Sequence, residues 1–255
     1  MKKKKLFIAI PSYKFINIEA VHCMFNLLSD VEDGRTLALH GGEGFVGRSR
    51  NHICSKFLES DFDELLQLDS DIIYTPENVN RIASLDVPIV AAFYAKKAPG
   101  MPVWVANRTS EGGSLGANAD QRGLVKVETI GTGFMKVQRE VLEKMRDDGL
   151  AARYIVDGTD IVEYEFFPFR VVNGRLRSED WSFCDNAHKA GFDVYGDTKN
   201  AVLHMGTAIY PTLEARIVEA LLKAVQKLQL RGEKVPQEIF DALALDPAYN
   251  VVKYP

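Results

Sequence analysis

Cysteine is scarce in this 255-residue sequence. Cys23, Cys54 and Cys184 are scattered, odd in number and without a CxxC spacing, which argues against a disulfide framework or a cysteine-based zinc site. Each lies in an apolar, helix-like context, so we expect buried free thiols. A reducing compartment suits such thiols, and the expected location is cytoplasmic.

Long apolar runs are also missing. After the lysines at positions 2–5, the apolar stretch of residues 6–10 is too short for a signal-peptide core and ends at Pro11. No later stretch is long enough to span a bilayer, so we expect no transmembrane segment. The lysines are interpreted as a charged terminus before a first strand, with weak attraction to anionic lipid as the alternative.

The sequence has no excess of positive charge. Its 31 Lys and Arg against 35 Asp and Glu give a formal net charge of −4, which argues against a nucleic-acid partner. Hydrophobic residues make up 46% of the chain, enough for a packed core. No internal repeat is present, so solenoid and propeller folds are not indicated.

Strand and helix patterns alternate over the first 93 residues. This alternation predicts an α/β fold with a mostly parallel, doubly wound central sheet. Ligands bind such sheets at the carboxyl ends of the strands, where Pro11-Ser12-Tyr13 and Asp69-Ser70-Asp71 fall. The expected strands cover residues 5–10, 36–39, 64–68 and 87–93, and the expected helices cover 17–29, 48–58 and 76–85.

The remaining chain is less regular. A Gly-, Ala-, Ser- and Asn-rich loop at 97–123 is long enough to be functional. Strands are expected at 124–137 (broken at 131–133), 161–169, 192–195 and 201–204, and helices at 139–147, 178–190, 211–230 and 236–243. We therefore expect a catalytic domain at 1–208 and a C-terminal helical extension at 209–255. The amphipathic helix 211–230 is expected to pack on that domain, with a dimer face or a membrane contact as alternatives.

The Asp69-Ser70-Asp71 segment is the strongest chemical signal. Its two carboxylates follow a buried strand and can aim at one point, as Mg²⁺ and Mn²⁺ sites require. A simple strand-end turn remains an alternative. A calcium EF-hand loop is excluded, because its sixth and twelfth positions would be Tyr74 and Asn80. A phosphatase with an aspartyl nucleophile fits less well, because this strand is the third of the chain.

Four further sites have both a functional and a structural interpretation. Arg48, Arg50 and Asn51 at the head of a helix can bind a diphosphate or form a solvated basic turn. Glu179 or Asp180 can act as a general base or simply cap a helix. His204, at a strand end, can complete a cation site or be structural. Tyr13 can stack on a nucleobase or pack at a rim.

The order of these motifs resembles the GT-A superfamily of glycosyltransferases, over about residues 5–207. The closest likeness is to small bacterial, phage and large-virus members with a Glu-Asp-x-x-Phe-Cys signature. The residues that carry the resemblance are Ile10-Pro11-Ser12-Tyr13, Arg48-Ser49-Arg50-Asn51, Leu68-Asp69-Ser70-Asp71, residues 90–94 with Lys96-Lys97, residues 131–135, residues 178–184 and Val202-Leu203-His204.

The resemblance implies a GT-A fold and a Mn²⁺ (or Mg²⁺) cofactor. It implies transfer of a sugar from a nucleotide-diphosphate donor, a UDP-sugar, to a glycan, lipid-linked or protein acceptor. Inversion is favoured, although retaining members share the metal site. The implied roles are metal binding by Asp69, Asp71 and His204, and donor binding by Pro11, Tyr13, Arg48, Arg50, Asn51, Asp69, Ser70 and Gly133. In the catalytic pair, Asp180 is implied as the base, with Glu179 beside it contacting the acceptor or the sugar.

Two other functions remain open at this stage. A sugar nucleotidyltransferase would share the fold, but it usually has a Gly-rich basic loop after the first strand, which residues 11–15 lack. A catalytically idle binding module would not need to retain all four of Asp69, Asp71, Asp180 and His204. A homo-oligomer formed through the C-terminal helices is a further possibility.

Overall fold

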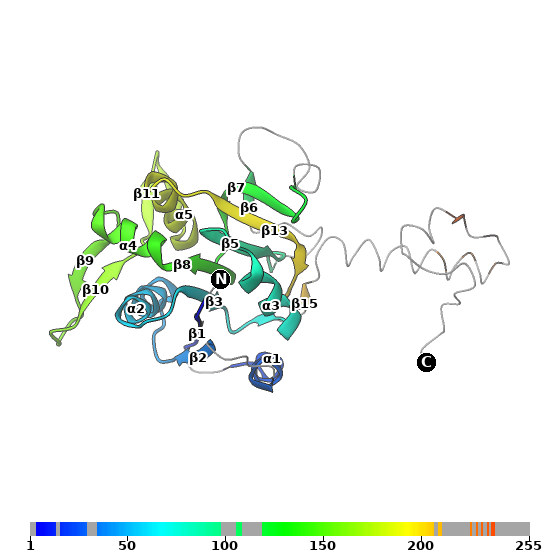
Figure 1. Ribbon diagram of the computed structural model, residues 1–255, viewed down its shortest axis with the longest axis horizontal. Helices are drawn as coiled ribbons and strands as arrows, with labels where there is room; N and C mark the ends of the chain where they lie inside the picture. The colour runs from blue at the N-terminus through cyan, green and yellow to red at the C-terminus, as the bar shows by residue number, and fades with distance from the viewer. Residues whose placement is uncertain are drawn as a thin grey trace.

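The computed structural model describes residues 4–13, 16–29, 35–97, 106–108, 119–206 and 209–210, with six single residues between 225 and 237. An eight-stranded sheet forms its centre (Figure 1). The strand order is β2 (Arg35–His40), β1 (Leu6–Pro11), β3 (Glu64–Leu68), β8 (Phe134–Gln138), β5 (Ile89–Phe93), β13 (Val194–Ala201), β7 (Leu124–Ile130) and β6 (Ala106–Arg108).

The sheet is mostly parallel, as the sequence predicts. β1 runs parallel to β2 and β3, and β13 runs parallel to β5. β8 is antiparallel to both of its neighbours, β3 and β5, and β7 is antiparallel to β13 and β6. Within the described sheet, β8 and β7 therefore run against the other strands. The carboxyl ends of β1, β2, β3 and β5 lie along one edge.

Helices cover both faces of the sheet (Figure 1). On one face, α1 (Ile18–Ser29) and α3 (Pro76–Ser84) pack on the side chains of Leu6, Ile8 and Ile10. On the other, α2 (Val46–Glu59), α4 (Arg139–Asp147) and α5 (Glu179–Lys189) pack around Ala9. Alternate residues of a strand point to opposite faces, so the apolar run of β1 serves both cores. The doubly wound arrangement is confirmed.

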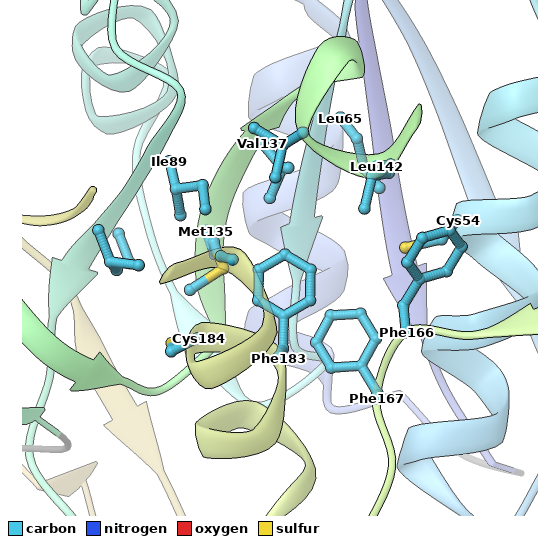
Figure 2. Close-up of a cluster of buried hydrophobic side chains, with 14 of the residues drawn as sticks. Cys54, Leu65, Ile89, Met135, Val137, Leu142, Phe166, Phe167, Phe183 and Cys184 are labelled. Atoms are coloured by element: carbon cyan, nitrogen blue, oxygen red, sulfur yellow. The ribbon is translucent and has the colours of Figure 1, made fainter. Parts of the chain in front are cut away.

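Aromatic side chains dominate the core on the α2, α4 and α5 face. Figure 2 shows Phe166, Phe167 and Phe183 packed together above the sheet. The Phe167 and Phe183 rings are stacked with centroids 4.6 Å apart. The sequence predicts a strand over 161–169, but the strand β10 ends earlier, at Val162–Glu165. The prediction was too long because Phe166 and Phe167 leave the strand to fill the core.

Two β-hairpins were not predicted from the sequence. One pairs β9 (Ala152–Ile155) with β10, and the other pairs β11 (Arg170–Val172) with β12 (Arg175–Arg177). A separate small sheet joins β4 (Ile72–Ile73), β14 (Leu203–Met205) and β15 (Ile209–Tyr210). β15 thus pairs with β14 across the expected domain boundary at 208. The rest of the expected C-terminal helices lies almost entirely outside the described residues.

All three cysteines are buried and free. Burial raises the pKa of the Cys184 thiol to about 12 and raises those of Cys23 and Cys54 as well. The thiolate is the reactive form, so the raised pKa keeps these thiols protonated and unreactive at mildly alkaline pH.

We therefore expect the native protein to react slowly with Ellman's reagent, and all three thiols to react once guanidinium unfolds the chain. Absorbance at the thionitrobenzoate band measures this directly. Rapid labelling of even one thiol in the native protein would contradict the described burial.

Among the described residues, no helix has both the length and the apolar character needed to cross a membrane.

Candidate functional site

The Asp69-Ser70-Asp71 turn lies at the carboxyl end of β3, where the resemblance expects it. The turn is fixed at both ends by backbone hydrogen bonds: Asp69 N donates to Gly133 O at 2.8 Å, and Met205 N donates to Asp71 O at 2.7 Å. β4, directly after the turn, pairs with β14. This pairing brings His204 beside Asp71, although 133 positions separate them in the chain (204 minus 71).

The hydrogen bonds of His204 determine which of its ring nitrogens is available. Nδ1 lies 2.8 Å from the carbonyl oxygen of Ala95. A carbonyl only accepts, so Nδ1 carries the proton and Nε2 keeps its lone pair when the ring is neutral. Nε2 lies 3.5 Å from Asp71 Oδ1. Metal-binding histidines usually have their second nitrogen held by a carbonyl in this way.

The Asp71 carboxylate has one paired and one available oxygen. Oδ2 accepts from the Lys97 ammonium. Oδ1 is buried and makes no hydrogen bond to any described group. Burial raises the pKa of Asp71, but the opposing effects of His204 and Lys97 together outweigh it. The pKa of Asp71 therefore lies below its ordinary value. Asp71 is therefore a carboxylate at neutral pH, with one oxygen and an imidazole nitrogen facing each other.

Asp69 faces a different partner. Arg50 Nη2 donates to both oxygens of Asp69, at 2.7 and 3.0 Å. Among the described residues, no three His, Cys, Asp or Glu side chains converge as a metal cage would require. Mg²⁺ and similar cations are often held by one or two carboxylates plus substrate phosphates and water. Asp71 and His204 fit that open type of site, and metal binding by Asp69 stays a prediction.

Arg50 bridges two carboxylates at the centre of the site. Its side chain is only 3% exposed, and Nη1 donates to Glu179 Oε1 at 2.9 Å while Nη2 holds Asp69. Burial raises the pKa of Glu179, Arg50 lowers it and Asp180 raises it, and the net direction is upward. The bridge joins α2, the end of β3 and the first turn of α5. Arg50 is thus a buried positioning residue of the site.

Asp180 lies beside Glu179 in the first turn of α5. Its Oδ1 accepts from the Ser178 hydroxyl and from Trp181 N, the latter at 2.8 Å. No described group hydrogen-bonds to Oδ2. One oxygen is thus fixed in position while the other is able to accept a proton.

Gly133 lies where the backbone must pass close to other groups. Its N–H donates to the Tyr94 hydroxyl at 2.9 Å. A Cβ at this position would lie 2.8 Å from Tyr94 Oη and 3.1 Å from Asp69 Oδ2. Only glycine fits without displacing Asp69.

Gly133→Ala is expected to destabilise the protein by about 1–3 kcal/mol, because the added methyl group overpacks a rigid, buried corner. Thermal unfolding followed by circular dichroism measures the change. Gly41→Ala is the matched control, since its Cβ would approach nothing closer than Ser12 O at 4.0 Å. Equal melting temperatures for the two variants would contradict the described contact.

Several expected donor-site residues lie elsewhere. Asn51 is buried, and its Oδ1 accepts from Phe167 N at 2.9 Å, so it holds the core segment rather than lining an open pocket. Arg48 is 61% exposed and faces Glu43 at 3.4 Å. It lines a cavity of about 300 Å³ with His40, His52, Tyr154 and Glu163, away from Arg50. Helical geometry explains why Arg48 and Arg50 lie in different places. Arg50 shares the apolar face of α2 with Ile53 and Phe57, whereas Arg48 does not.

Pro11, Tyr13 and Ser70 lie at the expected strand ends. Pro11 is the buried last residue of β1 and pairs with His40. The Tyr13 ring is 54% exposed and lies against Gly44, in the loop that follows β2. Ser70 forms the turn between the two aspartates. Their contacts with a donor remain predictions.

Tyr94 and Lys97 are site residues that belong to segments carrying the resemblance, but no role was assigned to them from the sequence. Tyr94 anchors Gly133, and its ring lies edge-on to His204 with centroids 5.1 Å apart. Lys97 neutralises one oxygen of Asp71. Both follow β5, which ends beside β8 at the same sheet edge. The rule that polar residues after parallel strands converge could have found them.

No family model and no curated protein sequence matches the chain. Among solved structures, A197 from STIV is similar with a TM-score of 0.50 and 19% identity, over 79% of this chain and 86% of that chain. The S. aureus TarS 1–349 structure gives a TM-score of 0.40 at 15% identity, over 94% and 69%. The likeness to A197 shows a shared α/β fold.

A third structure, a glycosyltransferase involved in the glycosylation of the major capsid of PBCV-1, gives a TM-score of 0.30 at 17% identity, over 53% of this chain and 62% of that one. At such identities the likeness concerns the fold alone. Asp69 and Asp71 follow β3 at the end of the sheet, and Arg50 links Asp69 to Glu179 in the first turn of α5.

Proposed function

We propose that this protein is a glycosyltransferase that moves a sugar from a nucleotide-diphosphate donor, a UDP-sugar, to a hydroxyl acceptor with inversion. The observation that carries the proposal is the pair formed by Asp71 and His204. A buried carboxylate oxygen of Asp71 without a hydrogen bond lies 3.5 Å from His204 Nε2, which carries a lone pair when the ring is neutral, and each side chain is fixed by a second contact. Such a pair is suited to a divalent cation.

Asp71 and His204 would hold Mn²⁺ or Mg²⁺, with Asp69 at the ribose side of the same turn. When bound, the cation supplies positive charge that stabilises a leaving diphosphate. Lys97 already pairs with Asp71, and its ammonium group would reach the donor phosphates from the same side. Tyr13, which is 54% exposed two residues after β1, would stack on the base.

The acceptor chemistry is assigned to the first turn of α5. Asp180 takes the proton of the acceptor hydroxyl on Oδ2 while Ser178 and Trp181 hold Oδ1. The hydroxyl oxygen then attacks the anomeric carbon as the bond to the diphosphate oxygen breaks. Glu179 does not serve as base, because its carboxylate is engaged by Arg50. The Arg50 bridge fixes the distance between the donor turn and this helix.

Donor turnover tests the proposal without knowledge of the acceptor. The protein is incubated with a panel of UDP- and GDP-sugars and Mn²⁺, and the release of free UDP or GDP is measured. Release from one nucleotide class, lost with EDTA and in Asp71→Ala, is expected. Release of pyrophosphate from sugar phosphate and UTP would instead identify a nucleotidyltransferase. Binding of a nucleotide sugar with no release under any acceptor mixture would favour an idle binding module.

A further inference from the structure

The β11–β12 hairpin has one face that the described structure leaves uncovered. Its strands pair Arg170 with Arg177 and Val171 with Leu176, across the turn Asn173-Gly174. Both turn residues have positive φ, 51° and 72°, as a tight two-residue hairpin turn requires. Every side chain from 171 to 176 is exposed. Figure 1 shows β11 at the periphery of the molecule, next to α5.

The two faces of this hairpin differ in chemistry. The Arg170–Arg177 rung turns toward α5, where Arg170 donates to Asn186 at 2.8 Å and Arg177 donates to Asp185 at 2.9 Å. The neighbouring Val171–Leu176 rung points to the opposite face. There Val171 is 73% exposed and Leu176 67% exposed, with Phe169 also exposed just before the strand. The arginines thus anchor the hairpin while its apolar face points outward.

Charge indicates what can cover this face. Residues 169–177 contain three arginines and no acidic residue, in a chain whose net charge is −4. Arg177 is neutralised by Asp185, but Arg170 contacts only a neutral amide and Arg175 has no carboxylate partner among the described residues. Arg175 pairs with Val172 and so lies on the arginine face, but it flanks the exposed Asn173-Gly174 turn. From the turn its long side chain can reach the surface that Val171 and Leu176 enter. A surface that is apolar inside and negatively charged outside matches this combination.

The β9–β10 hairpin provides an internal comparison. It also exposes two large apolar side chains, Ile155 and Ile161. Its turn, however, carries Asp157 and Asp160, and residues 152–165 contain four acidic residues and one arginine. An anionic surface would repel this hairpin. The two hairpins therefore present similar apolar side chains with opposite charge.

We propose that the β11–β12 hairpin docks the protein on an anionic lipid bilayer, with Phe169, Val171 and Leu176 entering the interface and Arg175 meeting lipid phosphates. The hairpin ends at Arg177, and Ser178 is the N-cap of α5, the helix that carries Glu179 and Asp180. Docking holds that helix at the membrane surface. If the proposed function is correct, the acceptor is presented from the bilayer, as a lipid-linked acceptor would be; the docking itself does not depend on the activity.

Vesicle flotation tests the docking. The full chain is mixed with vesicles of phosphatidylcholine alone or of phosphatidylcholine with phosphatidylglycerol, and the floating fraction is measured. Binding to the anionic vesicles is expected. Val171→Ser with Leu176→Ser should weaken it tenfold or more, from the apolar area removed. Arg175→Gln should weaken it about fivefold, the effect of one basic residue near an anionic surface.

The matched control is Ile155→Ser with Ile161→Ser, which removes similar exposed apolar area and should leave binding unchanged. All substituted side chains are exposed, and circular dichroism verifies folding. The single variant Leu176→Ser replaces the double variant if the double variant does not fold.

Absence of binding to anionic vesicles overturns the proposal. An equal loss of binding in the β11–β12 and the β9–β10 double variants overturns it as well. A concentration-dependent dimer that Leu176→Ser abolishes would assign the face to a second copy and also overturn it. Because no nucleotide is present, none of these outcomes reports on the glycosyltransferase proposal.

Discussion

Asp180→Asn is expected to lower the rate of sugar transfer by about 10²–10⁴-fold, the usual contribution of a general base. The amide of asparagine keeps the hydrogen bond from Ser178 but cannot take a proton from the acceptor. Donor affinity should not change, because Asp180 lies in α5 and not in the Asp69–Asp71 turn. Initial rates at saturating donor, together with the dissociation constant for the nucleotide, separate the two effects.

Glu179→Gln is the comparison variant. Glu179 neighbours Asp180 in the chain but pairs with Arg50 at 2.9 Å. Its replacement should act through the position and stability of the site, and a shift in melting temperature should accompany any loss of rate. If Glu179→Gln lost transfer completely while Asp180→Asn kept it, the two carboxylates would have to exchange roles.

Arg50→Ala is expected to destabilise the folded chain by about 3 kcal/mol or more, because it leaves two carboxylates without their shared cation. Glu179 is 13% exposed and Asp69 26% exposed, so solvent can compensate only in part. The raised pKa of Glu179 would rise further, since the charge of Arg50 is the largest influence that lowers it. Urea denaturation at neutral pH measures the difference.

Arg48→Ala is the matched control for this experiment. It removes the same side chain two positions earlier in α2, where the guanidinium is 61% exposed. A change within about 0.5 kcal/mol is expected there, as for most surface substitutions. Arg50→Lys should fall between the two, because an ammonium group keeps the charge but cannot reach both carboxylates with a fixed fork. Equal effects at positions 48 and 50 would contradict the buried bridge.

Three strands of the first half of the chain, β1, β3 and β5, could be predicted because they are mostly apolar. β1, β3 and β5 are buried on both faces, and such runs are typical of parallel strands. The positions of Asp69-Ser70-Asp71 and Pro11 at strand ends follow from the same pattern. The meeting of Asp71 with His204 could not be derived in this way, because it depends on the β4–β14 pairing of strands only two and three residues long.

The hairpins and the different environments of Arg48 and Arg50 in α2 were harder to predict. β11–β12 has an Asn-Gly turn between short apolar pairs, a recognised hairpin signal, but its strands are exposed and show no buried face. Arg48 and Arg50 have the same chemistry in the sequence. They differ only in their position around the helix: Arg50 lies on the same face of α2 as Ile53 and Phe57, and Arg48 does not. The buried arginine can therefore be predicted once the apolar face of α2 is identified.

The central claim is that Asp71 and His204 hold the cation that binds the donor diphosphate. Calorimetric titration of the protein with UDP and GDP, in Mn²⁺ and in EDTA, tests it most directly, repeated on Asp71→Ala and His204→Ala. Binding of one nucleotide that requires Mn²⁺ and is lost in both variants is the expected result. Nucleotide binding that is equally tight in EDTA, or that survives in both variants, would contradict the claim.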